Sequence, residues 1–302
     1  MQNSLKIDTV FKLDKVFNLH NWNKDDYNER GMFNRAGKLF EMLDSKEQEV
    51  FILILENMRY YSIESYEQLL EECLLQLLND ERKKSHYYFA PVLPHRNHAE
   101  IRDIENNEGI INIENKIFDV KSSMLVTYLI KSNTLQYNKD IAEVKMTTSY
   151  YYSQEVIDVI NRKEVVLVLI DDFIGSGDTV LESIEYFINQ GVEKEKIRVL
   201  SLVTGQQGYE KIKSENIKIF TGSIVPSFID IMKNMEMKEE EIKEIKEIIA
   251  SISNKLRIEK DYFGYNNSFF LVSMIRTPNN APSFLWNNKN KNVSDKIVFP
   301  RL

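Results

Sequence analysis

The chain has 302 residues, of which 43% are hydrophobic and 28% are charged, a balance typical of globular proteins that excludes a disordered chain. Its formal net charge of -7 is spread along the sequence, so long-range attraction to nucleic acid or anionic lipid is not indicated. The start MQNSLKIDTV does not resemble a signal peptide, and every apolar run is too short to span a bilayer. We therefore expect a cytoplasmic protein with no membrane contact.

The first part of the chain, from about residue 22 to 80, has a helical pattern. Ser45 with Gln48, and Ser65 with Gln68, fit the capping-box spacing ahead of apolar residues three and four positions apart. These patterns predict two packed helices. The only cysteine of the chain lies in the second one, where a buried structural thiol is expected rather than a reactive one.

Further along, the pattern changes to alternating strands and helices. A short aromatic strand is expected at 87–93, and a helix at 121–132. The run VVLVLI at 165–170 has no polar alternation, as expected of a central parallel strand that is covered on both faces. A helix over 179–190 and a strand over 197–203 complete a βαβ unit. Open α/β sheets bind ligands at the carboxyl ends of such strands.

The rest of the chain is expected to continue the α/β pattern, with a helix at 207–216 and a strand at 217–225. The segment 238–256 has isoleucines at heptad-like spacing, which predicts one amphipathic helix whose stripe packs in the core or against a partner helix. A last strand is expected at 268–275. We divide the chain into an N-terminal helical region, an α/β domain and, within that domain, a helical insertion; their ranges are 1–84, 85–302 and 227–260.

The loop DDFIGSGDT, directly after the central strand, could bind a phosphate group. Gly175 and Gly177 allow a tight turn that brings backbone amides close to an anion, and the next helix adds N–H donors at its start. Ser176 and Thr179 supply hydroxyl donors. These residue types together predict a monophosphate cradle.

The two adjacent carboxylates Asp171 and Asp172 are good acceptors for a pair of vicinal hydroxyls, such as those of a ribose. Ribose 5-phosphate therefore suits both halves of the segment, although aspartates at a strand end can also simply cap the loop and the next helix. A P-loop is rejected because Asp178 stands where that motif needs lysine, and the dinucleotide motif GxGxxG is absent.

The string VVLVLIDDFIGSGDT resembles the phosphoribosyl diphosphate signature of type I phosphoribosyltransferases, and the similarity extends over roughly 150–225. The resemblance implies a Rossmann-like parallel sheet with flanking helices and a site for phosphoribosyl diphosphate with Mg²⁺. In it, Asp171 and Asp172 would bind the ribose hydroxyls, and Gly175 to Thr179 would wrap the 5-phosphate. Asp178 departs from the family pattern, which usually has a small or basic residue there. No clear diphosphate loop is found; KSSM at 121–124 is only a candidate.

The C-terminal stretch GYNNSFFLVSMIRTPNNAPSFLW, with the loop and the helical N-terminal region, resembles a divergent phosphoribosyltransferase-like group. This group, PRTase-CE, occurs in bacterial conflict and defence systems, including retron-associated ones. The resemblance implies a hood over the base or acceptor, with Asn279, Asn280 and Trp286 near it. The alternative is that residues 278–280 form a turn and Trp286 fills the core.

A group of histidines and a run of tyrosines are weaker indications of function. His86, His95 and His98 lie close together near Arg96, but a loop HxxH without a third ligand more often marks a surface cluster than a metal site. The tyrosines at 150–152 could stack on bases, although packing against the sheet is the simpler expectation.

Two functions remain open on this sequence. The first is transfer of ribose phosphate from phosphoribosyl diphosphate to an unknown acceptor, as an effector in bacterial (anti-phage) defence; the sequence assigns no catalytic residue. The second is a non-catalytic module that senses a nucleotide or ribose phosphate within a larger assembly. A protein or ribonucleoprotein partner is expected to bind through the N-terminal helices or the 238–256 helix.

Overall fold

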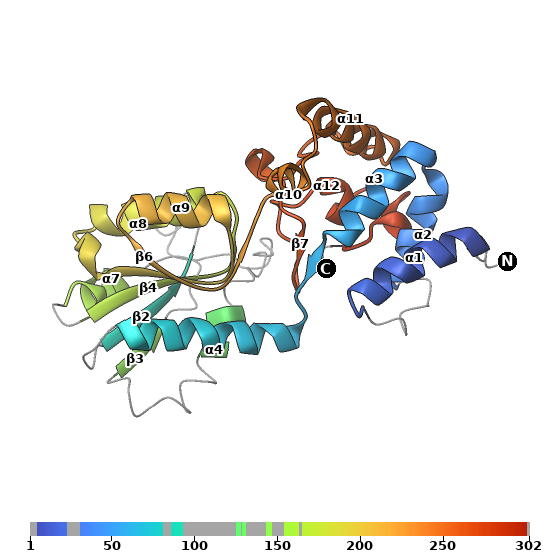
Figure 1. The fold of residues 1–302 in the computed structure, drawn as a ribbon. Coiled ribbons are helices and arrows are strands. Elements are labelled where there is room, and N and C mark those ends of the chain that lie inside the picture. The colour runs from blue at the N-terminus through green and yellow to red at the C-terminus, as the bar shows by residue number, and fades with distance from the viewer. Residues whose placement is uncertain are drawn as a thin grey trace, which may run out of the picture. The chain divides into compact units, whose positions relative to one another are not determined.

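The structure is a computed structural model that describes residues 5–22, 31–80, 86–92, 125–127, 129–130, 143–146, 154–162 and 165–300. The chain forms two compact units, which we describe separately (Figure 1). The helical unit comprises residues 1–62 and 226–302, and the sheet unit comprises residues 63–225. The sequence-based regions 1–84 and 85–302, with the insertion at 227–260, remain a prediction.

The sheet unit is built on five parallel strands in the order β3-β2-β4-β5-β6. The strands are β2 (His86–Pro91), β3 (Glu143–Met146), β4 (Val165–Ile174), β5 (Ile197–Gly205) and β6 (Lys218–Val225). The strand that contains the apolar run, β4, is the middle one of this order. The predicted α/β class and the predicted central parallel strand are therefore confirmed.

Helices cover both faces of this sheet (Figure 1). They are α4 (Ile63–Asp80), α7 (Gln154–Ile160), α8 (Asp178–Asn189) and α9 (Gln206–Ser214), with a short 3₁₀ turn, η2 (Lys194–Lys196). Leu167 and Leu169 of β4 belong to one buried cluster with Ile184 and Phe187 of α8, which lies on the face opposite α4. Coverage of both faces explains why β4 has an unbroken apolar run.

α4 is fixed to the sheet by polar contacts as well as by apolar packing. The thiol of Cys73 donates to the carbonyl oxygen of Ser201 in β5 at 3.2 Å. The side-chain amide of Gln76 donates to the carbonyl oxygen of Thr221 in β6 at 3.1 Å and accepts from its N–H at 3.3 Å. Cys73 and Gln76 are three residues apart and therefore lie on one face of the helix. Their contacts with β5 and β6 fix the position of α4 along the sheet.

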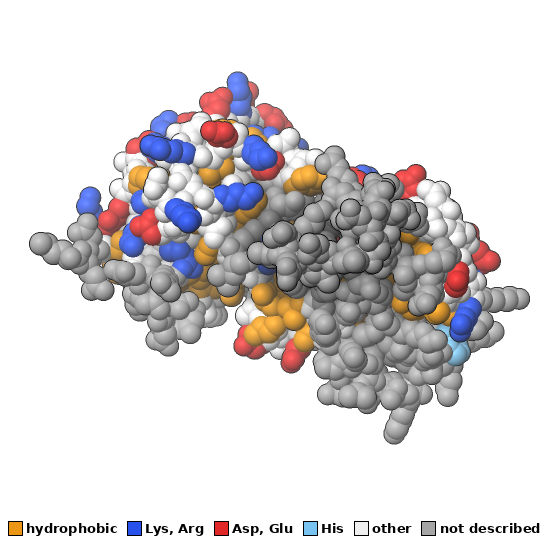
Figure 2. Space-filling view, turned by 180° about the vertical axis from the view of Figure 1, so that it is seen from behind, with side chains coloured by type: hydrophobic (Ala, Val, Ile, Leu, Met, Phe, Trp, Pro, Cys, Tyr) orange, Lys and Arg blue, Asp and Glu red, His pale blue; other side chains and the backbone are white. Residues whose placement is uncertain are grey.

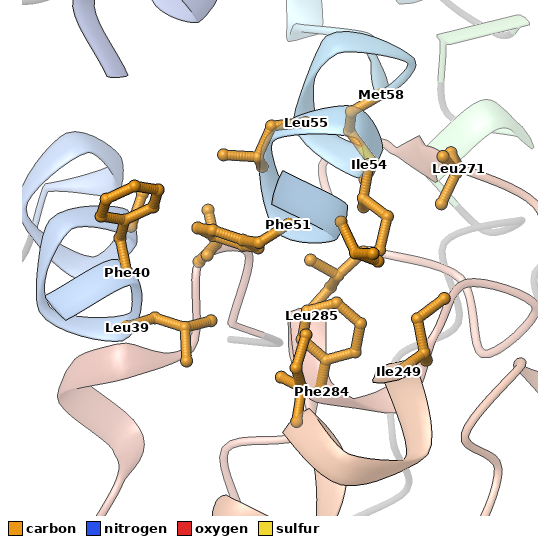
Figure 3. Packing of buried hydrophobic residues seen from close by; sticks show 14 of the residues in the cluster. Leu39, Phe40, Phe51, Ile54, Leu55, Met58, Ile249, Leu271, Phe284 and Leu285 are labelled. Carbon is orange, nitrogen blue, oxygen red and sulfur yellow. The ribbon is translucent and has the colours of Figure 1, made fainter. Parts of the chain in front are cut away.

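The helical unit contains α1 (Ile7–Leu19), α2 (Met32–Met42), α3 (Ser45–Glu56), α10 (Phe228–Asn234), α11 (Glu239–Lys255) and α12 (Ser283–Trp286). It also holds the 3₁₀ turns η3 (Tyr265–Asn267) and η4 (Ser294–Lys296), and the short parallel pair β1 (Arg59–Tyr60) and β7 (Val272–Ser273). Side chains of α3, α11 and α12 form its core, including Phe51, Ile54, Ile249, Phe284 and Leu285 (Figure 3).

The isoleucine stripe of α11 is buried within this core. Ile242, Ile245, Ile249, Ile252 and Leu256 are all at most 8% exposed and belong to the same cluster as the apolar residues of α3. The chain itself therefore covers the stripe, and the alternative of a partner helix on that face does not apply. A partner surface elsewhere on α11 or on the N-terminal helices remains a prediction.

Two predicted helix starts and one predicted strand differ from the structure. Asp44 caps α3, accepting from the N–H of Glu47 at 3.1 Å, while Gln48 donates to the carbonyl oxygens of Phe40 and Leu43 instead. α4 already begins at Ile63, so Ser65 lies in its first turn. The strand predicted at 268–275 is only two residues long, and left-handed backbone at residue 269 interrupts the predicted stretch.

The described surface carries both kinds of charge. On the face shown in Figure 2, Lys and Arg side chains lie among Asp and Glu side chains. This mixture agrees with a sequence that predicts no broad basic surface. Within the described residues, every helix is too short or too polar to cross a membrane.

Candidate functional site

The two adjacent aspartates lie inside β4, three and two residues before its last residue, Ile174, and not just after a strand that stops at residue 170. Ladder pairing continues past them, from Asp171 opposite Ser201 to Ile174 opposite Thr204. Because neighbouring residues of a strand project from opposite faces, the two carboxylates leave β4 on different sides. Asp172 is 4% exposed, whereas Asp171 is partly exposed and accepts from the backbone N–H of Asp172 at 3.0 Å.

A tyrosine from α4 contacts the buried member of the pair. The hydroxyl of Tyr66 donates to Oδ2 of Asp172 at 3.3 Å, and Tyr66 itself is fully buried. The two residues are 106 positions apart in the sequence. Sequence patterns missed Tyr66 because it falls in a helix that was interpreted only as an apolar packing element.

The glycine loop has the backbone geometry that was expected of it. Gly177 has a φ of 83° and immediately precedes the first helical residue of α8. The tight turn predicted at Gly175 and Gly177 is therefore confirmed. The three residues Gly175, Ser176 and Gly177 are buried, and α8 begins directly behind them, as a phosphate cradle at a helix start requires.

Asp178, the residue that departs from the family pattern, is held by two partners. Its Oδ2 accepts a hydrogen bond from the hydroxyl of Ser176 at 2.7 Å, and its Oδ1 forms an ion pair with Lys211 of α9. A carboxylate in the first turn of a helix also interacts favourably with the helix dipole. Lys211, which the sequence patterns did not single out, therefore compensates the negative charge beside the loop.

The first turn of α9 packs directly on the loop. A Cβ placed on Gly208 would lie 2.4 Å from the carbonyl oxygen of Gly175 and 3.1 Å from the backbone nitrogen of Gly177. A Cβ on Gly177 would in turn lie 3.3 Å from the Cα of Gly208. A side chain on Gly177 would therefore meet α9 first.

The predicted hood residues lie in the helical unit, whereas the aspartates and the loop lie in the sheet unit. The side-chain amide of Asn280 donates to the hydroxyl of Ser268 at 2.9 Å, and the indole N–H of Trp286 donates to the carbonyl oxygen of Ala281 at 2.9 Å. The N–H of Ala281 donates to the carbonyl oxygen of Pro278 at 3.2 Å, as in a turn. Asn279 is exposed. Their role as a hood remains a prediction.

Cys73 is not a reactive group in this fold. Burial raises the pKa of its thiol to about 12, because the thiolate would lose its hydration. Across the described ranges, no three side chains of His, Cys, Asp or Glu come together as a metal site would need. KSSM at 121–124, His95, Arg96, His98 and the tyrosines at 150–152 lie outside the described residues, and His86 is in β2.

A parallel α/β sheet whose middle strand carries an acidic pair, followed by a glycine turn into a helix, defines a phosphoribosyltransferase-like protein. The chain belongs to the PRTase-CE family, whose model matches residues 19–301. The association of this chain with a conflict system or a retron is not part of that match.

Among solved structures, the chain is similar to one described as "Structure of AQ2163 protein from Aquifex aeolicus". The two are 11% identical, with 65% of this chain and 84% of the other covered at a TM-score of 0.30. No curated protein sequence matches the chain.

Proposed function

We propose that the chain binds phosphoribosyl diphosphate at the carboxyl end of β4 and transfers its ribose phosphate to an acceptor. The observation that carries the proposal is the acidic pair of β4, followed at once by the Gly177 turn and the start of α8. Membership in a phosphoribosyltransferase-like family supports the same interpretation. A defence role, with the chain as an effector, extends this proposal and rests on the family resemblance alone.

In this proposal the loop binds the 5-phosphate and the aspartates bind the ribose hydroxyls. The backbone amides of residues 175–179 and the hydroxyls of Ser176 and Thr179 are the kinds of donor that bind an anion, while carboxylates suit hydroxyl donors. The acceptor forms a bond to the anomeric carbon, and the bond from that carbon to the diphosphate breaks with its electron pair leaving on the diphosphate. The acceptor loses its proton to solvent.

Mg²⁺ fits the donors that are present. Mg²⁺ is usually held by one or two carboxylates together with substrate phosphates, so a single carboxylate of the pair, such as that of the partly exposed Asp171, would be enough to hold it with the substrate. When bound, the metal neutralises charge on the diphosphate leaving group. The chain's own part is to orient the ribose phosphate and hold its charges in place.

A second candidate function is a sensor that binds a nucleotide or ribose phosphate without turnover. One observation favours it. The Ser176 hydroxyl, which is expected to donate to a phosphate, donates its hydrogen bond to the carboxylate of Asp178 instead. A ligand must compete with that carboxylate, which suits reversible sensing of an abundant ligand.

The experiment uses the full chain with labelled phosphoribosyl diphosphate, Mg²⁺ and a cell extract, measuring diphosphate release and the fate of the label. Diphosphate release with a labelled acceptor is the expected result. Binding of nucleoside monophosphates without release in any extract would favour the sensor. If neither phosphoribosyl diphosphate nor monophosphates bind, both functions are wrong.

A further inference from the structure

We propose that Tyr66 is a positioning residue for the acidic pair, which orients the carboxylate of Asp172 toward the ribose hydroxyls. This inference rests on the proposed function, because it assigns a partner to one of the residues that would bind the sugar. Its basis is the hydrogen bond from the Tyr66 hydroxyl to Oδ2 of Asp172 at 3.3 Å, inside the sheet unit.

The need for such a residue follows from strand geometry. Asp171 and Asp172 leave β4 on opposite faces, so they can reach one ligand only from two sides of the strand end. Each carboxylate then needs its own support. Asp171 accepts from the N–H of Asp172, and Asp172, which is 4% exposed, accepts from Tyr66 on the α4 side.

The position of Tyr66 is fixed by contacts that do not involve the aspartates. Cys73 and Gln76 lie seven and ten residues further along α4 and bind backbone groups of β5 and β6. α4 therefore cannot slide or turn without breaking these bonds, and the phenol of Tyr66 stays beneath Asp172. A rigid element that holds a functional side chain is the usual means of preorganising a site.

The length of the bond suits a positioning role. At 3.3 Å it is longer than the usual hydroxyl to oxygen hydrogen bond. Hydrogen bonds of active sites are often long without ligand and tighten in the complex. Loss of the hydroxyl is therefore expected to weaken ligand binding.

The test compares two sugars that differ only at one of the two hydroxyls that the carboxylates would bind. Calorimetry of the full chain with Mg²⁺ measures the Kd of ribose 5-phosphate and of 2-deoxyribose 5-phosphate. The unchanged protein should prefer ribose 5-phosphate. Tyr66→Phe should weaken ribose 5-phosphate about fivefold to tenfold and 2-deoxyribose 5-phosphate less than about twofold, so that the preference shrinks.

Tyr186→Phe is the matched control, since Tyr186 is a buried tyrosine of α8 in the same unit that packs on Phe187. It should leave both affinities unchanged. A folded Tyr66→Phe variant with an unchanged preference, or with both sugars weakened equally, would overturn the positioning role and leave the proposed function standing. If the unchanged protein binds neither sugar phosphate, the proposed function fails and this inference fails with it.

Discussion

Gly208 of α9 lies so close to Gly175 of the glycine loop that a Cβ on residue 208 would be 2.4 Å from the carbonyl oxygen of residue 175. Backbone and not a flexible side chain occupies that space, so the loop itself must move to admit a methyl group. The shape of the glycine loop therefore depends on α9, a separate element later in the chain.

Gly208→Ala is expected to displace the loop and to weaken ribose 5-phosphate binding at least tenfold, because a cradle of backbone amides works only at close range. Calorimetry on the folded variant measures the change. Gln207→Ala, at an exposed neighbour in the same helical turn, is the control and should bind normally. An unaltered affinity in Gly208→Ala would mean that the loop does not hold the phosphate.

Gly177→Val should abolish monophosphate binding. Its φ of 83° lies in the left-handed region, where a residue with a Cβ costs roughly 1–2 kcal/mol, and the side chain would also press on Gly208. Thermal unfolding of the variant should show a lower Tm, and equilibrium dialysis with a nucleoside monophosphate should show no binding. A folded variant that binds normally would contradict both the phosphate loop and the family-based function.

Replacing Asp171 and Asp172 together with Asn should impair binding of ribose phosphates, because charged acceptors are exchanged for weaker neutral ones. Each lost charged hydrogen bond is worth roughly 1.5–3 kcal/mol. The measurement is calorimetry with ribose 5-phosphate, and Glu182→Gln combined with Glu185→Gln, at two exposed positions of α8, is the charge-matched control. Equal affinity in the double variant and the control would exclude the ribose role.

Asp178 and Lys211 should change phosphate affinity in opposite directions. Asp178→Asn removes a negative charge beside the loop and should strengthen binding, whereas Lys211→Met leaves that charge uncompensated and should weaken it. The Lys211 side chain is 45% exposed, so solvent screening limits each effect to about twofold to fivefold. Titrations with inorganic phosphate at low and high salt measure these changes in affinity. The difference in affinity between each variant and the unchanged protein should become smaller at high salt. Lys213→Met is the control and should bind phosphate like the unchanged protein.

Because the pKa of the Cys73 thiol is raised, we expect the folded chain to lose stability at high pH. Its pKa is about 12 in the folded chain, above the ordinary value, so the native thiol keeps a proton that the unfolded chain releases. The protonated thiol therefore adds its full contribution to the free energy of unfolding below about pH 9. This contribution falls as pH rises toward 12, by at most about 1.4 kcal/mol per pH unit. Urea unfolding of the unchanged protein and of Cys73→Ala measures it: the difference between their free energies of unfolding should narrow over this range. A constant difference would contradict the assignment.

The sequence was most informative where local patterns determine structure. The run 165–170, the glycine turn and the segments that became α8, β5, α9 and β6 were all predicted, because apolar periodicity and turn chemistry act over a few residues. What local patterns could not indicate was pairing at long range. Tyr66 meets Asp172 across 106 residues, and Lys211 meets Asp178 across 33. The sequence overestimates the length of strand β7, which has two residues, because a run of apolar residues does not reveal left-handed backbone.

The contact between Gln76 and Thr221 has a consequence for association between molecules. β6 is the last strand at its end of the described sheet, and a strand in that position normally offers unpaired N–H and C=O groups to any extended chain. The amide of Gln76 imitates a peptide group and occupies both backbone groups of Thr221. Gln76→Ala should therefore expose a template for intermolecular strand addition, and the chain should aggregate sooner on mild heating.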